Sequence, residues 1–143
     1  MRRIVTAAAV AVAATMALAV ALPAAAASRP EAEQKKIDYL LGEVKASSAT
    51  FIRNGQEYQA EKAVSHLKRK LMFAGGRVQT ARQFIVGVAS RSEESKEPYK
   101  MRLPAGATVE LGTWLMERLV TYEDAHGEGP HAKQAAAAET PRS

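Results

Sequence analysis

The 143-residue chain contains no cysteine. Small domains often depend on disulfides for stability, so this chain must rely on packing alone. The absence also excludes thiol catalysis and thiolate ligands for a metal ion. Only three histidines are present, and they lie far apart in the sequence at His66, His126 and His131. We therefore expect no metal site and no cofactor.

Signature catalytic motifs are missing as well. The sequence has no Gly-x-Ser-x-Gly, no His-Glu-x-x-His and no glycine-rich phosphate loop after a predicted strand. His66 could act as a general base beside Glu57 or Glu61, with Arg53 holding an anion. However, Arg53 can equally pair with Glu57, and Glu61 suits a helix N-terminus. A small hydrolase-like enzyme is therefore an alternative rather than the leading hypothesis.

The one long apolar run lies at the N-terminus. Two arginines precede the uncharged segment Ile4–Leu22, and Ala25–Ala27 has the small-x-small pattern that signal peptidases cleave. A retained transmembrane helix is the alternative, but alanine is barely apolar, so we expect no stable membrane span after cleavage. Residues 1–27 are therefore predicted to be a signal peptide cleaved near Ala27, and the mature protein is expected to be periplasmic or secreted. No cysteine follows the run, which excludes a lipoprotein anchor there.

The mature chain has the length of a single domain. Residues 28–126 are predicted to form one small α+β domain. Removal of residues 1–27 takes away two arginines and lowers the net charge from +5 to +3. Residues 127–143 contain no large apolar side chain that could offset the entropy of ordering, so this segment is predicted to be a disordered tail.

A β-hairpin is predicted at the centre of the domain. Two β-prone runs, Thr50–Arg53 and Gln56–Tyr58, are joined by Asn54-Gly55, a pair that accepts the positive φ angles of a type I′ turn. A short second β-pair is expected where Pro98–Leu103 alternates apolar and polar residues and Thr108–Leu111 follows.

About four helices are predicted to pack with these strands. They cover Glu31–Lys45, Ala60–Ala74, a segment that starts near Thr80, and Trp114–Tyr122. Thr80 and Gln83 have the spacing of a capping box. Met72 and Phe73 lie off the apolar face of the second helix, so they either pack against a neighbouring helix or leave an exposed apolar spot.

Positive charge is concentrated on the second and third helices. Residues 62–92 include seven lysines and arginines and no acid. Lys62, His66 and Arg69 lie together on the face opposite the apolar face of the second helix. Together with Arg53 and Tyr58 of the hairpin, they are the candidate binding residues.

This basic face favours a non-catalytic binding or interaction module. Its partner would be an anionic small molecule, an envelope polymer or an acidic protein surface. Nucleic acid is not expected, because aromatic and basic residues are not interleaved as they are in a stacking platform. Two other interpretations stay open: the charges are ordinary solvated helix faces, or the protein is a purely structural envelope component without a small-molecule ligand.

Several short segments, taken in order, resemble a known family. They are Phe51-Ile52-Arg53-Asn54-Gly55, Tyr58, Ala60-Glu61-Lys62-Ala63, His66-Leu67, Lys70, Ala81-x-x-Phe84-Ile85, Ala89-Ser90, Pro98-Tyr99 and Trp114-Leu115. This combination, over about residues 35–122, resembles the YfeK-like family of small exported bacterial proteins of unknown function. The resemblance implies a shared fold and an envelope location but no activity.

One difference from that family bears on the fold. Many relatives have a cysteine just before the Phe-x-Arg-Asn-Gly segment and another near the end of the Pro-Tyr strand, where this chain has Ala49 and Leu103. The resemblance therefore implies that Ala49 and Leu103 are neighbours and that a structural disulfide between hairpin and strand has been lost here.

Overall fold

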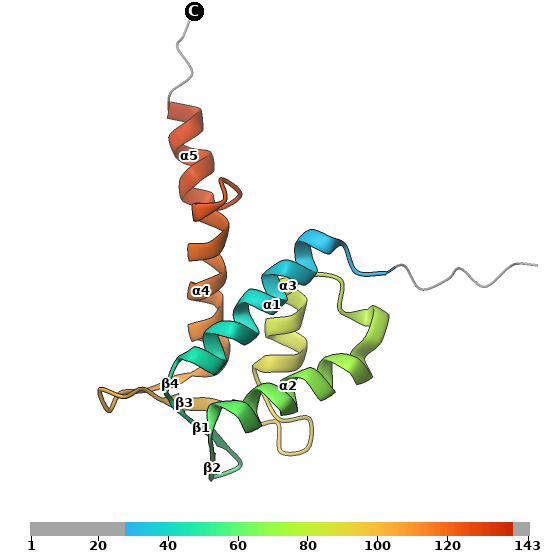
Figure 1. The fold of residues 1–143 in the computed structure, drawn as a ribbon, viewed down its shortest axis with the longest axis vertical. Coiled ribbons are helices and arrows are strands. Elements are labelled where there is room, and N and C mark those ends of the chain that lie inside the picture. The colour runs from blue at the N-terminus through green and yellow to red at the C-terminus, as the bar shows by residue number, and fades with distance from the viewer. Residues whose placement is uncertain (1–27, 139–143) are drawn as a thin grey trace, which may run out of the picture.

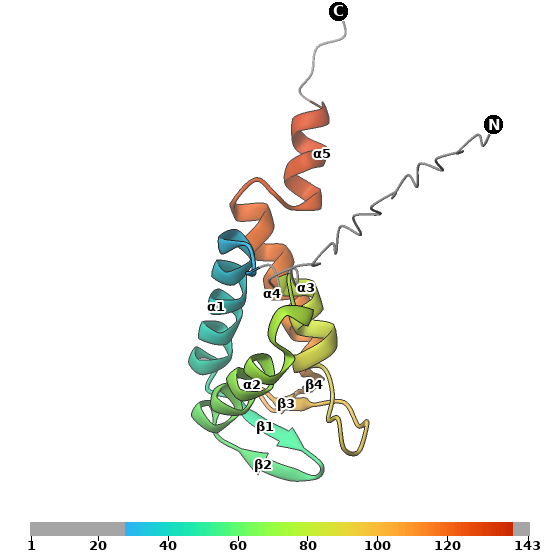
Figure 2. The ribbon, with the colours of Figure 1, turned by 90° about the vertical axis from the view of Figure 1, so that its right-hand side faces the viewer.

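The computed structural model describes residues 28–138, so the predicted signal peptide, residues 1–27, lies outside the described part. The elements are α1 (Glu31–Ala46), β1 (Thr50–Arg53), β2 (Gln56–Tyr58), α2 (Ala60–Ala74), α3 (Ala81–Phe84), β3 (Lys100–Arg102), β4 (Thr108–Glu110), α4 (Leu111–Ala125) and α5 (Pro130–Ala138). The chain continues from α3 directly into a π-helix, Ile85–Ala89. The fold is α+β, as the sequence predicts, with a small sheet below a group of helices (Figures 1 and 2).

The four strands form one antiparallel sheet in the order β2-β1-β3-β4. Asn54 and Gly55 connect β1 to β2 with φ angles of 51° and 74°, which confirms the positive φ angles predicted for this turn. The sequence predicts two separate β-pairs. The structure joins them, because β1 also pairs with β3 and places Ile52 opposite Lys100.

One face of the sheet is covered by helices. A row of one residue from each strand, Tyr58, Phe51, Met101 and Val109, crosses this face. Phe51 and Met101 are buried, whereas Tyr58 and Val109 on the edge strands are partly buried. Residues two apart on a strand share a face, so Arg53 also projects from the covered face.

The rest of the core lies between the helices. The most buried large side chains come from α1, α2, α3 with its π-helix, and α4: Ile37, Leu40, Val44, Leu67, Phe84, Ile85, Val88, Leu115 and Leu119. The capping box at the start of α3 is formed, since the Thr80 hydroxyl accepts from the Gln83 amide and the Gln83 side chain accepts from the Thr80 amide. The burial of Ile37, Leu40 and Val44 in α1, and of Phe84, Ile85 and Val88 after Thr80, shows that each segment turns one apolar stripe to the core.

The C-terminal segment differs from the predicted disorder. Residues 130–138 form α5, and residues 139–143 lie outside the described part. Alanine has the highest helix propensity, and the Asp124 carboxylate accepts hydrogen bonds from the amides of His131 and Ala132 at the start of α5. A side chain of the folded domain therefore caps the segment, which composition alone does not indicate.

The end of α2 carries exposed apolar side chains. Met72 is 69% exposed and Phe73 is 72% exposed, so neither packs against a neighbouring helix. Val86 on the π-helix is 65% exposed as well. Of the two interpretations that the sequence leaves open for Met72 and Phe73, the exposed apolar spot is the one that the structure shows.

A buried ionic cluster joins α1 to the end of α4. The Lys36 ammonium group, on a residue only 7% exposed, lies 3.2 Å from Glu123, 2.7 Å from Glu128 and 3.4 Å from Glu33. Arg82 of α3 pairs with the other oxygen of Glu123 at 2.8 Å. Burial by itself lowers the pKa of Lys36, but its hydrogen bonds to Glu128 and Glu123 and the charge of Glu33 outweigh burial and raise the pKa above its ordinary value. Lys36 therefore stays charged.

We predict that Lys36→Met destabilises the domain by about 3 kcal/mol, because it leaves the carboxylate of Glu123 in a buried position with Arg82 as its remaining partner. Lys35→Met is the matched control, since Lys35 makes an exposed pair with Glu31 that is worth less than about 1 kcal/mol. Urea unfolding of residues 28–143 measures both changes. Equal stability of the two variants would show that the buried cluster does not stabilise the fold.

The register of the sheet places Ala49 and Leu103 at corresponding positions. Thr50 lies opposite Arg102, so the residues one step further along these antiparallel strands are Ala49 and Leu103. Directly opposed residues in an antiparallel pair have Cα atoms about 4.5–5.5 Å apart, which suits a disulfide. The register therefore makes Ala49 and Leu103 neighbours, as the family resemblance implies.

We predict that Ala49→Cys with Leu103→Cys forms an intramolecular disulfide and stabilises the domain by about 2–4 kcal/mol. Mass spectrometry detects the bond, and urea unfolding with and without reductant measures its effect. Thr50→Cys with Leu103→Cys is the out-of-register control and should remain reduced. Failure of the first pair to oxidise while the control oxidises would show that the register is different.

Candidate functional site

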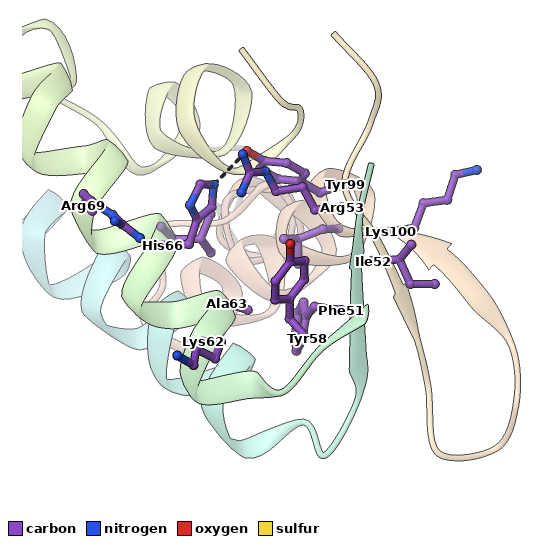
Figure 3. Close-up of a pocket in the computed structure, with 12 residues that line it drawn as sticks. Phe51, Ile52, Arg53, Tyr58, Lys62, Ala63, His66, Arg69, Tyr99 and Lys100 are labelled. Carbon is purple, nitrogen blue, oxygen red and sulfur yellow. Dashed lines mark hydrogen bonds between the residues drawn. The ribbon is translucent and has the colours of Figure 1, made fainter. Parts of the chain in front are cut away.

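A cavity of about 130 Å³ lies between α2 and the sheet (Figure 3). Its lining comes from β1, the end of β2, α2, the start of β3 and the start of α4. The lining residues are Phe51, Ile52, Arg53, Tyr58, Lys62, Ala63, His66, Leu67, Arg69, Tyr99, Lys100 and Leu111. Figure 3 shows that the side chains of Ile52 and Lys100 point away from α2, as their positions on the opposite face of the sheet require.

All five candidate binding residues line this cavity. Arg53 ends β1 and Tyr58 ends β2, so the hairpin places both beside α2. Lys62, His66 and Arg69 follow at intervals of four and three residues, which puts them on one side of α2. The five residues selected from the sequence therefore lie around one cavity in the folded chain.

Tyr99, one of the apolar positions in the alternating segment Pro98–Leu103, is a further residue of the cavity lining. It precedes β3 and lies opposite Arg53 when the register of β1 and β3 is continued by one residue. Its hydroxyl lies 3.0 Å from Nε2 of His66, and the two rings meet edge to face. Tyr99 is buried, so its hydrogen bond to His66 is shielded from water.

Lys70 holds the same hydroxyl from the other side. Its Nζ donates to the Tyr99 hydroxyl at 3.3 Å and to the carbonyl oxygens of Val88 at 2.7 Å and Arg91 at 2.9 Å. The ammonium group also lies 5.0 Å from the centre of the Tyr99 ring, within cation–π range. Lys70 thus ties α2 to the end of the π-helix, where backbone carbonyls have lost their helical partners. This role is structural, and no sequence pattern marks it.

The hydrogen bonds around Tyr99 determine the tautomer of His66. A lysine ammonium can only donate, so the Tyr99 oxygen accepts from Lys70 at one of its two acceptor positions, and the Arg53 guanidinium, which also hydrogen-bonds to it, takes the other. The proton of Tyr99 is then the group that faces His66. His66 Nε2 is the acceptor for that proton, which leaves the ring proton of neutral His66 on Nδ1.

Positive charge also keeps His66 neutral. Burial lowers the pKa of His66, and the charges of Arg53, Lys70 and Arg69 lower it further. The pKa of Tyr99 is raised by burial, although the neighbouring Arg53 guanidinium opposes that shift by its charge and by a hydrogen bond. At pH 7 the inner site therefore contains a neutral imidazole and a neutral phenol.

The pairing of Arg53 with Glu57, which the sequence leaves open as an alternative, is not formed. Glu57 instead forms an ion pair with Arg102 at 2.8 Å, across the outer face of the sheet. Within residues 28–138, Arg53 makes no ion pair, and its Nε is buried without a hydrogen-bond partner. The cavity thus has a partly buried guanidinium whose charge is not balanced by a neighbouring carboxylate.

The arrangement required by the hydrolase alternative is not formed in the described residues. No carboxylate of residues 28–138 lines the cavity, and the hydrogen-bond partner of His66 is Tyr99 rather than Glu57 or Glu61. The same part of the chain has no group of three or more His, Asp or Glu side chains placed to hold a metal ion. It also has no helix both long and apolar enough to cross a membrane.

Comparisons with known proteins agree with the resemblance seen in the motifs. Residues 31–123 match DUF5329, a family of unknown function. The chain is also similar to an uncharacterized protein, YfeK, of Salmonella typhimurium (strain LT2), with 41% identity over 68 residues. That match covers 47% of this chain and 57% of the relative, a little over half of its length. No solved structure matches the chain. The chain therefore belongs to DUF5329, and its resemblance to YfeK-like proteins is confirmed.

Proposed function

We propose that the mature protein acts outside the cytoplasm as a binding module, holding a small anionic ligand in the cavity between α2 and the sheet. The observation that carries the proposal is the convergence of Arg53, Lys62 and Arg69 on one cavity that no carboxylate of residues 28–138 lines. Positive charge gathered at a concave, partly desolvated surface attracts anions more strongly than the same charge on an open face.

Burial distinguishes this site from an ordinary solvated helix face. Arg53 and His66 are both partly buried, and the buried Nε of Arg53 has no hydrogen-bond partner within the described residues. A ligand cannot reach this buried Nε, but the partly buried guanidinium has no carboxylate partner among residues 28–138, so a bound anion would stabilise its charge. Solvated lysines such as Lys68 need no such compensation.

Binding fits the site better than hydrolysis does. A histidine that acts as a general base is usually oriented by a carboxylate, which raises its basicity. Here the Tyr99 hydroxyl donates to the nitrogen that would accept a proton, and the surrounding cations lower the pKa of His66. Both effects oppose proton abstraction, whereas the same cations favour a bound anion.

A small molecule also fits better than the face of an acidic protein. The charges converge on a cavity of about 130 Å³, rather than spreading over the flat area of roughly 800 Å² per partner that a stable protein interface needs. A single side chain of a partner protein could enter the cavity, but most of such an interface would lie outside it.

We predict that anions raise the melting temperature of residues 28–143 and that added salt weakens the effect, since a ligand that binds only the folded state stabilises it. Acetate, benzoate and inorganic phosphate serve as probes. Arg53→Gln and Arg69→Gln should each reduce affinity by about tenfold or more, because each removes a charged hydrogen-bond donor.

Lys68→Gln is the matched control for these variants. It removes the same charge from an exposed position on α2 next to Arg69 but outside the cavity lining, so it should change affinity less than about twofold. If Lys68→Gln lost as much anion affinity as the two arginine variants, binding would depend on the overall charge of α2, and the cavity would not be the binding site. No stabilisation by any of the three anions would overturn the proposed function.

We also predict that anion affinity increases as the pH falls below 6.5, the ordinary pKa of histidine. The folded-state pKa of His66 lies below that value, so His66 is neutral at pH 7 and gains its charge only in more acidic solution. Without ligand, stability should decline as the pH falls from 6.5 to the folded-state pKa, because the unfolded chain binds the proton more readily. NMR titration of the His66 ring and calorimetry at several pH values measure both effects.

His66→Gln isolates this contribution to the pH dependence. The glutamine carbonyl can still accept a hydrogen bond from Tyr99 but cannot take up a proton. Anion binding by the variant should therefore lose most of its rise in acidic solution. A rise of the same size as in the natural chain would assign the pH dependence to another group.

A further inference from the structure

The inner wall of the cavity is apolar, in contrast to its charged rim. Phe51 of β1, Leu67 of α2 and Leu111 of α4 are buried there, and Ala63 of α2 is partly buried. Lys62 and Arg69 of α2 also line the cavity, but they are exposed and lie at its rim. One end of the cavity therefore suits an apolar group and the other suits an anion.

Apart from the Arg53 guanidinium, the polar side chains at the cavity wall already have hydrogen-bond partners within the protein. The Tyr99 hydroxyl donates to His66 and accepts from Lys70, with Arg53 against it, so it has no free hydrogen-bonding capacity for a ligand. The Tyr58 hydroxyl donates to the side chain of Gln56. A hydrophilic ligand such as a sugar would therefore lose its hydrogen bonds to water here without replacing them.

The size of the cavity limits the apolar group. Its volume of about 130 Å³ is close to that of an apolar cavity of about 150 Å³ that holds one benzene ring. A methyl group would leave most of this space empty, and two fused rings would exceed it. One ring, or a short branched chain of similar volume, matches the cavity.

We propose that the ligand is a small amphiphilic anion, with one apolar group of about ring size against Phe51 and Leu67 and one acidic headgroup at Arg53. This inference rests on the proposed function and adds the chemical class of the ligand. A planar guanidinium can hold a carboxylate through two parallel hydrogen bonds and can also bind a phosphonate. Carboxylate and phosphonate ligands of this class share a compact anionic headgroup attached to one apolar group.

A series of probes tests the apolar part on the natural chain. Acetate, butyrate, benzoate and 2-naphthoate carry one carboxylate each and differ in apolar size. Because each buried CH₂ group contributes about a fourfold gain in affinity, benzoate should bind at least tenfold more tightly than acetate. 2-Naphthoate should bind more weakly than benzoate, and benzyl alcohol, which has the ring without the charge, should bind at least tenfold more weakly. Comparison of benzoate with phenylphosphonate identifies the preferred headgroup.

Ala63→Leu tests the location of the apolar part. The larger side chain occupies the inner cavity without changing any charge, so benzoate affinity should fall to that of acetate while acetate affinity stays the same. Arg53→Gln should weaken both ligands together. The two variants thus separate ring recognition from charge recognition, and the probe series remains decisive if Ala63→Leu does not fold.

The outcomes distinguish the two proposals. If acetate and benzoate bind equally, with Arg53→Gln weakening both, the anion site stands and the inferred ligand class is wrong. If the preference for benzoate survives in Ala63→Leu, the ring is bound elsewhere and the inference is overturned. If no anion binds the natural chain, the proposed function itself fails.

Discussion

The antiparallel pairing of β1 with β3 is the contact on which the rest of the structure depends. It joins two local β-pairs into one sheet and brings the hairpin of residues 50–58 against a strand that lies more than forty residues away in sequence. It also sets Arg53 beside Tyr99, so the wall of the cavity exists only because this register is correct. A shift of one residue in this register would turn the side chains of one strand to the outer face and so separate Arg53 from Tyr99. The β1–β3 register therefore determines both the sheet and the geometry of the candidate site.

The basic residues of α2 divide into groups with different roles. Lys70 is partly buried, and its ammonium group donates to two backbone carbonyls and to the Tyr99 hydroxyl. These hydrogen bonds connect α2 to the end of the π-helix. Lys68 is exposed and lies outside the cavity, whereas Lys62 and Arg69 lie at its rim. The basic residues of α2 therefore do not form one patch with one role. The contacts of each ammonium or guanidinium group indicate whether that residue is structural, solvated or part of the cavity.

Local patterns in the sequence predicted most of the helices and strands. They did not predict features that depend on contacts between residues far apart in the chain. The Asn54-Gly55 turn, the Thr80 capping box and the apolar stripe of α1 depend on neighbours a few residues away, and all three were predictable. The pairing of β1 with β3 and the capping of α5 by Asp124 depend on the folded chain, and no local pattern indicated either; only the family resemblance placed the hairpin beside the later strand. For the candidate site, helical periodicity gathered Lys62, His66 and Arg69, but it could not reveal that Tyr99 meets them across the sheet.

The state of the Tyr99 hydroxyl bears most directly on what the site can do. A phenol that acts as an acid or base in catalysis must exchange its proton, so its pKa must lie near the working pH. Here burial raises the pKa of Tyr99, and the hydrogen bond to His66 uses its proton. His66 receives that proton on the nitrogen that would otherwise accept one from a substrate. The two groups thus satisfy each other and form a fixed polar support beneath an apolar cavity with a cationic rim. Such an arrangement favours retention of an anion over reaction with it, because its charges are preorganised and its titratable groups are held in their neutral forms.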